Sequence, residues 1–327
     1  MPLDDRQRAA ALETLRTATG SISDDRREQI LELLAERAAQ GATTLRAGVT
    51  APVQIWRDER GIPHIRASST HDLFFAHGYA QAQDRLWQLD YLRRQALGRL
   101  SEIFGEAKLS EDRIAHTLRL PKIARAVYEH STAGSRAALD AFAAGVNAFR
   151  DEAMAPGGAL PIEFDLLDSR PDPWSPVDSI AILRRWYWYL TGRLNVITTP
   201  EAVRAGVDDA DRYEAFFAPD GPVRYIVPEG NYPTEPRWPG LPQDPVLPSF
   251  WGQTLGEGSN NWAVSAALSA TDEALLSSDP HVYYTVPADW YDAHLSAPGF
   301  ESWGITYPGC PTTLLGRGRE FGWGITN

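Results

Sequence analysis

The spacing of apolar residues divides the chain into a mainly helical first half and a strand-rich end. Between residues 4 and 40, leucines and isoleucines recur at helical spacing among Arg, Asp and Glu, which predicts two amphipathic helices. Similar spacing predicts further helices from near Ser69 to Phe104, over about 132–151, and from Ser175 to about Arg193.

Short alternating runs predict strands in two regions. Val53 and Ile55, followed by Ile62 and Ile65 beyond a turn, are typical of paired strands over residues 52–66. After Ser259 the apolar runs become short, and Gly, Pro and Asp separate them. These runs predict strands at residues 261–266, 274–278, 301–306 and 320–326.

Signals at helix ends support the helical predictions. Ser69 and Asp72 resemble a capping box, with Asp in place of the usual Glu or Gln, and Gly105 is the expected stop of that helix. Ser175 is predicted to cap a later helix that has proline at its first position, with Asp178 closing the box.

Four segments follow from these patterns. Residues 1–50 are predicted to be a helical N-terminal extension, and residues 51–217 a mainly helical part. Nine prolines crowd the stretch that follows, and neither helices nor central strands tolerate them, so residues 218–258 are predicted to be an extended linker. Residues 259–327 are predicted to begin a β-rich part.

Composition narrows the functional classes. The net charge of −12 argues against nucleic-acid binding, which requires a basic surface. No run reaches the roughly 18 apolar residues of a membrane helix. The first 50 residues lack the apolar core of a secretory signal, which predicts a cytoplasmic location. Cys310 is the one cysteine, so no internal disulfide is expected, and its turn-like context predicts a structural role.

The most informative motif is Gly258-Ser259-Asn260-Asn261, with Trp262 directly after it. If the bond before Ser259 is cut, its hydroxyl is a nucleophile and its new α-amine is a base. An α-amine has a pKa of about 7.7–8.0, so a useful fraction is neutral at pH 7. Ser, Asn and Gly are also ordinary turn residues, and the four letters alone usually mark a loop.

Three further segments accompany this motif in a fixed order. They are residues 53–65, which include Gly61-Ile62-Pro63-His64, residues 79–89, which include Asp84-Arg85, and Asp279-Pro280-His281, with Trp290-Tyr291 and His294-Leu295 beyond it. In this order and at these separations, the segments resemble the penicillin acylase (penicillin amidase) family of N-terminal nucleophile hydrolases. That family includes cephalosporin acylases and acyl-homoserine-lactone acylases, and the resemblance covers about residues 50–327.

The resemblance implies a fold and a route of maturation. The expected fold class is α+β: an N-terminal nucleophile hydrolase αββα sandwich, incomplete here, with a mainly helical N-terminal part. The precursor is expected to split at Gly258–Ser259 into two chains and to lose the proline-rich spacer. Because the resembled enzymes carry several hundred residues after the nucleophile, the chain is expected to be truncated at its C-terminus. Their common export to the periplasm or medium contrasts with the cytoplasmic location predicted above.

The resemblance also implies roles for individual residues. Ser259 is the expected nucleophile, and Gly258 is expected to let the backbone adopt strained geometry and to leave its carbonyl open. His281 falls where the family places a glutamine or histidine that helps orient the serine amine and the substrate amide. Its alternative is a turn histidine. Asn327 falls at the position whose backbone N–H stabilises the oxyanion.

Substrate and metal positions are implied near the end of the helical part. Arg193 and Leu194 lie where the family has an Arg-aromatic pair, although Leu replaces the aromatic residue, and with Trp262 they are expected to contact substrate. Glu201 is the implied ligand of a structural calcium ion. Its alternative is a solvated glutamate after Pro200. No organic cofactor is expected.

His64, Asp84 and Arg85 belong to the family signature without demanding a catalytic role. Asp84 and Arg85 are expected to form ion pairs that fix a helix to the sheet, since such networks are common without catalysis.

The predicted function is that of a self-processing amidohydrolase that cleaves an N-acylated small molecule, such as a β-lactam or an acyl-homoserine lactone, through an acyl-enzyme. No nucleic-acid or membrane partner is expected. One alternative is a non-catalytic scaffold of the same fold that binds an apolar or sugar ligand. A serine hydrolase with an internal triad is less favoured, because Ser259 lacks a Gly-x-Ser-x-Gly elbow.

Overall fold

The computed structural model describes residues 42–191, 194–207, 209–217, 258–282 and 285–326. The helices predicted between residues 4 and 40, and the proline-rich segment up to residue 257, lie outside these residues. The chain divides into two compact units. One contains the described residues up to Trp186 and from Gly258 onward, and the other lies within Tyr187–Glu257.

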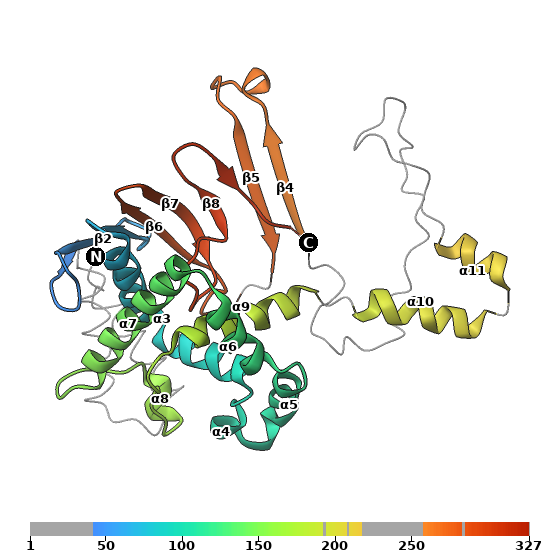
Figure 1. Cartoon of the computed structure of the whole chain (residues 1–327), viewed down its shortest axis with the longest axis horizontal. Helices are drawn as coiled ribbons and strands as arrows, with labels where there is room; N and C mark the ends of the chain where they lie inside the picture. The colour runs from blue at the N-terminus through green and yellow to red at the C-terminus, as the bar shows by residue number, and fades with distance from the viewer. Residues whose placement is uncertain (1–41, 192–193, 208, 218–257, 283–284, 327) are drawn as a thin grey trace, which may run out of the picture. The chain divides into compact units, whose positions relative to one another are not determined.

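A seven-stranded sheet is the framework of the first unit, with its strands in the order β1-β2-β3-β6-β7-β8-β9 (Figure 1). The strands are β1 (Ala42–Leu45), β2 (Val53–Arg57), β3 (Pro63–Arg66), β6 (Tyr291–Ala297), β7 (Phe300–Thr306), β8 (Leu315–Arg317) and β9 (Gly322–Trp323). β3 and β6 are parallel, and the other neighbouring pairs are antiparallel. The β3–β6 pair therefore joins strands from before the helices to strands from after Ser259.

This continuous sheet contains strands from three of the segments predicted from the sequence. β1, which was not predicted, lies at the end of the segment 1–50 and pairs with β2 along its whole length. Strands from the predicted parts 51–217 and 259–327 belong to the same sheet. The α+β class, with a helical first part and a sheet, is confirmed.

Ser259 belongs to a separate two-stranded antiparallel sheet. Its strands are β4 (Gly258–Val264) and β5 (Leu275–His281), and a short turn of 3-10 helix, η2 (Ala266–Leu268), lies between them. β4 begins three positions before the strand predicted at residue 261, so the whole Gly-Ser-Asn-Asn motif is extended rather than a loop.

The helices lie between β3 and β4 in the sequence. They are α3 (Thr70–Leu97), α4 (Ser101–Phe104), the 3-10 helix η1 (Gly105–Lys108), α5 (Leu109–Thr117), α6 (Leu120–His130), α7 (Ala133–Met154), α8 (Ile162–Leu166), α9 (Pro176–Thr191), α10 (Leu194–Gly206) and α11 (Ala210–Phe217). None of the described helices combines the length and apolar character needed to cross a membrane.

Helix α3 begins at a serine cap and ends at a glycine, with two differences from the prediction. The Ser69 hydroxyl accepts a hydrogen bond from the Asp72 N–H at 3.1 Å, as a cap does. The Asp72 carboxylate does not return this bond, because it accepts hydrogen bonds from the N–H and hydroxyl of Thr50. The helix ends at Gly98, which adopts the left-handed conformation at φ 71°, and Gly105 ends only the short α4.

The start of α9 follows the predicted capping box. The Asp178 carboxylate accepts a hydrogen bond from the Ser175 N–H at 2.8 Å, and the Ser175 hydroxyl accepts one from the Val177 N–H at 3.2 Å. Trp186, on the same helix, is buried and stacks on Tyr307 with ring centroids 5.4 Å apart.

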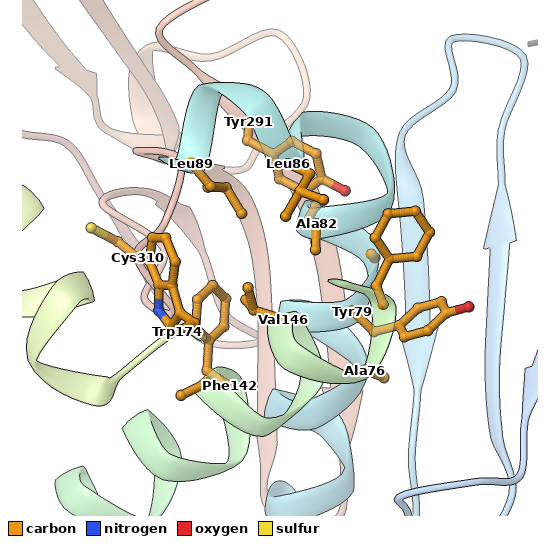
Figure 2. Close-up of a cluster of buried hydrophobic side chains, with 14 of the residues drawn as sticks. Ala76, Tyr79, Ala82, Leu86, Leu89, Phe142, Val146, Trp174, Tyr291 and Cys310 are labelled. Atoms are coloured by element: carbon orange, nitrogen blue, oxygen red, sulfur yellow. The ribbon is translucent and has the colours of Figure 1, made fainter. Parts of the chain in front are cut away.

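Helices α3 and α7 pack at backbone distance because each carries a glycine at the crossing. A β-carbon on Gly145 would lie 1.8 Å from the carbonyl oxygen of Phe75, and one on Gly78 would lie 2.1 Å from that of Phe142. Figure 2 shows the buried side chains around this crossing, including Phe142 and Val146 of α7. This core holds α3 against the sheet.

A polar contact also fixes α3 to the sheet, which confirms the structural role predicted for Asp84. Its carboxylate lies 2.8 Å from the Arg57 guanidinium of β2 and accepts a hydrogen bond from the Tyr291 hydroxyl of β6 at 2.8 Å. Burial, and secondarily the charge of Asp84, raises the pKa of Tyr291, so the phenol stays protonated and can donate. The neighbouring Arg85 donates to the carbonyl of Ala288 at 3.3 Å.

Cys310 has the structural environment that its sequence context predicts. Its side chain is buried, and burial raises the pKa of the thiol to about 12. A thiol that stays protonated at neutral pH is a poor nucleophile.

Candidate active site

Ser259 lies at the exposed start of β4, directly beside the end of β5. In the ladder Gly258 is opposite His281, Ser259 is opposite Pro280, and Asn260 is opposite Asp279. Ser259 is partly buried, whereas Gly258 and His281 are exposed. The hairpin therefore brings together the residues on both sides of the predicted cleavage bond and the predicted orienting histidine.

Asp279 and Asn260 both contact Nε2 of His281. Oδ2 of Asp279 lies 3.1 Å from this atom, and Nδ2 of Asn260 lies 3.4 Å from it. The carboxylate is the closer partner and only accepts hydrogen bonds, so this contact favours the tautomer with a proton on Nε2 and an acceptor at Nδ1. Nδ1 lies 4.0 Å from the place that a β-carbon would occupy on Gly258.

Gly258 begins the extended strand β4. Among the described residues other than its chain neighbours, a β-carbon there would meet only Nδ1 of His281 within 4 Å. The strained geometry that the sequence analysis expects at Gly258 stays a prediction.

The segment that follows β9 contacts this hairpin. The Thr326 hydroxyl donates a hydrogen bond to the carbonyl oxygen of Ser259 at 3.1 Å. The Ser278 hydroxyl donates to Oδ1 of Asn261 at 2.7 Å, and a β-carbon on Gly324 would lie 2.6 Å from that Ser278 oxygen. Residues after β9 therefore lie against both strands of the hairpin.

The predicted substrate contacts, Arg193, Leu194 and Trp262, and the predicted oxyanion residue, Asn327, come from different segments of the chain. Trp262 lies on β4 opposite Ser277 and is 64% exposed. Leu194 is the first residue of α10, which lies in the second compact unit. Arg193 and Asn327 lie outside the described residues. The roles of all four stay predictions.

A family comparison decides what kind of chain this is. The profile of the family described as Penicillin amidase matches residues 52–327. The chain belongs to the penicillin amidase family.

Individual members of the penicillin amidase family show how far the likeness extends. The chain is 35% identical over 277 residues to penicillin acylase 2 proenzyme of Pseudomonas sp. (strain SE83), an alignment that covers 81% of this chain and 34% of the relative. It is 28% identical over 299 residues to acyl-homoserine lactone acylase QuiP of Pseudomonas aeruginosa, covering 85% of this chain and 33% of the relative. The chain thus spans about a third of the length of the curated relatives it matches.

A solved structure, titled thermostable penicillin G acylase from Alcaligenes faecalis in tetragonal form, also matches. Its TM-score is 0.46 and its identity 26%, over 58% of this chain and 97% of that one.

Glu201, the predicted calcium ligand, is paired with an arginine. Glu201 lies inside α10, its side chain is exposed, and its carboxylate is 2.6 Å from the Arg204 guanidinium. Within the described ranges, no group of three or more His, Cys, Asp or Glu side chains is arranged to hold a metal ion. Glu201 is thus exposed and paired with Arg204, and its role as a calcium ligand stays a prediction.

His64 of the family signature lies in the seven-stranded sheet and not in the hairpin. Its ring stacks on Trp56 with centroids 3.8 Å apart, and its Nδ1 is 3.0 Å from Nδ1 of His294. This pair sits where β3 meets β6, so it contributes to the parallel junction of the sheet.

A pocket of about 520 Å³ opens beside β7 and the residues around β9. It is lined by Phe74, Gly299, Phe300, Glu301, Ser302, Thr312, Thr313, Gly318, Arg319, Glu320, Phe321 and Trp323. None of the predicted site residues that the structure describes lines this pocket.

Two residues of the site had no predicted role: Asp279 and Thr326. Asp279 had a usable signal, because residues two apart on a strand share a face, and His281 is two positions later. Thr326 had none, because it lies outside the strands and its partner Ser259 is distant in the sequence.

Proposed function

We propose that this chain carries the nucleophile of a self-processing amidohydrolase, in which Ser259 first cleaves its own chain and then the amide bond of an N-acylated small molecule. The observation that carries the proposal is the placement of Gly258–Ser259 on an exposed strand directly beside the Asp279-held ring of His281. Membership of the penicillin amidase family supports the reaction class.

Self-cleavage starts at the carbonyl carbon of Gly258. The Ser259 hydroxyl oxygen attacks it, and Nδ1 of His281, the acceptor in the neutral ring, takes the hydroxyl proton. The Gly258–Ser259 C–N bond then breaks, and the nitrogen receives that proton, so an ester replaces the amide. Water hydrolyses the ester, which leaves a carboxylate on Gly258 and restores the hydroxyl of Ser259, whose α-amine is already free.

Substrate hydrolysis uses the same hydroxyl with a new base. The α-amine of Ser259 takes the hydroxyl proton, directly or through one water, while the oxygen attacks the substrate carbonyl. The leaving amine receives the proton, and water then releases the acid from the acyl-enzyme. The backbone N–H of Asn327 is the proposed donor to the oxyanion.

The substrate class follows from the same proposal. N-acylated small molecules such as a β-lactam or an acyl-homoserine lactone match the chemistry named in the relatives, penicillin and acyl-homoserine lactone acylases. Trp262, Arg193 and Leu194 are the proposed substrate contacts. The αββα sandwich of N-terminal nucleophile hydrolases is the proposed complete fold.

Intact mass and N-terminal sequencing of the purified chain test the proposal. A new chain beginning Ser-Asn-Asn-Trp is expected, and Ser259→Ala is expected to abolish it. The matched control is Ser277→Ala, an exposed serine on β5, which is expected to cleave normally.

Two results would contradict the proposal. Cleavage that persists in Ser259→Ala would exclude this serine as the nucleophile. A chain that stays whole even when extended to the length of its relatives would favour a non-catalytic, ligand-binding scaffold.

A further inference from the structure

The carbonyl oxygen of Ser259 is held from outside its own hairpin. The Thr326 hydroxyl donates a hydrogen bond to it at 3.1 Å. The residue opposite Ser259 in the ladder is Pro280, which has no backbone N–H and cannot donate to this carbonyl. The Thr326 hydroxyl is thus a partner of this carbonyl that comes from outside the hairpin.

Two glycines bring Thr326 to this position. A β-carbon on Gly322 would lie 2.9 Å from a leucine side chain of β5, and one on Gly324 would lie 2.6 Å from the Ser278 hydroxyl. A β-carbon on Gly324 would also lie 2.8 Å from the β-carbon of Ser278, so this approach requires the missing side chain, whereas the end of the leucine side chain near Gly322 could move aside. The segment thus runs directly against the hairpin and reaches the Ser259 carbonyl at Thr326.

We propose that Thr326 is a positioning residue for the nucleophile, an inference that rests on the function proposed for Ser259. Before cleavage, peptide bonds on both sides hold Ser259 in place. After cleavage the bond to Gly258 is gone, and a terminal residue frays unless other contacts hold it. A hydrogen bond to the Ser259 carbonyl fixes the peptide plane next to the α-carbon that bears both the hydroxyl and the amine.

The same hydrogen bond links the nucleophile to the proposed oxyanion donor. Thr326 directly precedes Asn327 in the sequence, and the proposed N–H belongs to the peptide bond between them. Holding Thr326 on Ser259 therefore restrains one side of that peptide group. Thr326 itself touches no reacting atom, so its effect is on geometry, which catalysis requires to be accurate.

Paired substitutions separate the hydroxyl from the shape of the side chain. Thr326→Val keeps the branched shape and loses the hydroxyl, whereas Thr326→Ser keeps the hydroxyl. In processed protein, with the p-nitroanilides of phenylacetic and octanoic acid as probes, Thr326→Val is expected to lower kcat about 3- to 10-fold, the effect of one ordinary hydrogen bond. KM is expected to change little, self-cleavage to slow less than kcat falls, and Thr326→Ser to stay near the wild-type values.

A second measurement does not depend on catalysis. In the Ser259→Ala chain, which keeps the carbonyl at this position, hydrogen exchange of the β4 amides reports whether the strand end is held. Adding Thr326→Val is expected to raise the exchange rate at residues 258–264 about 3- to 10-fold, and adding Thr326→Ser is expected to leave it unchanged.

The outcomes separate this inference from the proposed function. Unchanged kcat and unchanged exchange in Thr326→Val would overturn the positioning role and leave Ser259 as the nucleophile. An equal effect of Thr326→Ser would also overturn it, because the hydroxyl would then not matter. Cleavage that persists in Ser259→Ala would refute the proposed function, and the exchange rates would still decide whether Thr326 holds the strand.

Discussion

The Nδ1 atom of His281 faces Gly258 across the β4–β5 ladder, because Asp279 binds the opposite nitrogen of the same ring at 3.1 Å. If the proposed self-cleavage takes place, this nitrogen is an acceptor near Gly258 before any α-amine exists. A precursor needs such a base, since the α-amine appears only after the first cleavage.

Removal of this ring or of its support is expected to slow self-cleavage. His281→Ala should slow it about 10²- to 10⁴-fold, the usual contribution of a general base. Asp279→Ala should slow it about 10-fold, because the loss of a charge-assisted hydrogen bond frees the ring to turn. Quantifying the chain that begins at Ser259 over time, by mass spectrometry, measures both rates.

Asp279→Asn is the matched control for this prediction. Its amide oxygen can still accept the Nε2–H of His281, so its rate should fall between those of the wild type and Asp279→Ala. Equal rates in the wild type and Asp279→Ala would show that the orientation of His281 does not depend on Asp279.

Gly258 offers a second prediction, because the described residues leave room for a β-carbon there. Gly258→Ala should cleave within about 3-fold of the wild-type rate, a difference of ~0.7 kcal/mol in the barrier. Gly258→Val places a branched side chain beside the attacked carbonyl and toward His281, and should slow cleavage about 10-fold, or ~1.4 kcal/mol. The same time course measures both variants, and a complete loss of cleavage in Gly258→Ala would show that a glycine is required.

Local signals in the sequence predicted local structure well. The cap at Ser69, the box at Ser175 and Asp178, and the antiparallel pair over residues 52–66 all appear in the structure. The stop at Gly98 was missed, because apolar residues continue at helical spacing into α4 and conceal the break.

Contacts between distant segments could not be predicted in the same way. β6 shows the alternation of a strand, with Tyr291 and Leu295 buried, but nothing in its residues indicates that it pairs in parallel with β3. Likewise, the motif around Ser259 and the position of His281 were recognisable, yet the contact from Thr326 depends on how two sheets meet. Pairing of remote strands is decided by the whole fold rather than by local preference.

Because α3 and α7 pack closely, we expect substitutions of two glycines on α7 to have very different effects on stability. Gly145→Ala should destabilise the protein by about 3 kcal/mol or more, because the new β-carbon would overlap the Phe75 carbonyl and push the helices apart. Gly134→Ala, also on α7, has no atom within 4 Å of its β-carbon and should stabilise it by about 0.5–1 kcal/mol. Urea unfolding of both variants measures the difference, and similar effects at the two positions would contradict the close packing.

Protonation of His77 should lower the free energy of unfolding as the pH falls. Its ring is buried on α3, where Gln81 lies 2.9 Å from Nε2, and burial lowers its pKa to about 4, outweighing a backbone hydrogen bond at Pro311. In the unfolded chain the pKa of histidine is about 6.5, so between these values the unfolded state binds more protons. The stabilisation that comes from keeping His77 neutral is therefore complete above about pH 6.5 and is lost as the pH falls toward about 4. This loss lowers the free energy of unfolding by about 3 kcal/mol.

His77→Leu tests this titration, because it keeps an apolar side chain in the core and removes the ionisable group. The variant should lose less stability than the wild type between pH 7 and pH 4.5, as measured by urea unfolding at each pH. The comparison cancels the carboxylates and the other histidines, whose titrations are common to both proteins. His130→Gln, a substitution of an exposed histidine, is the control that should keep the wild-type dependence. Parallel curves for His77→Leu and the wild type would mean that water reaches the ring and that its burial does not oppose protonation.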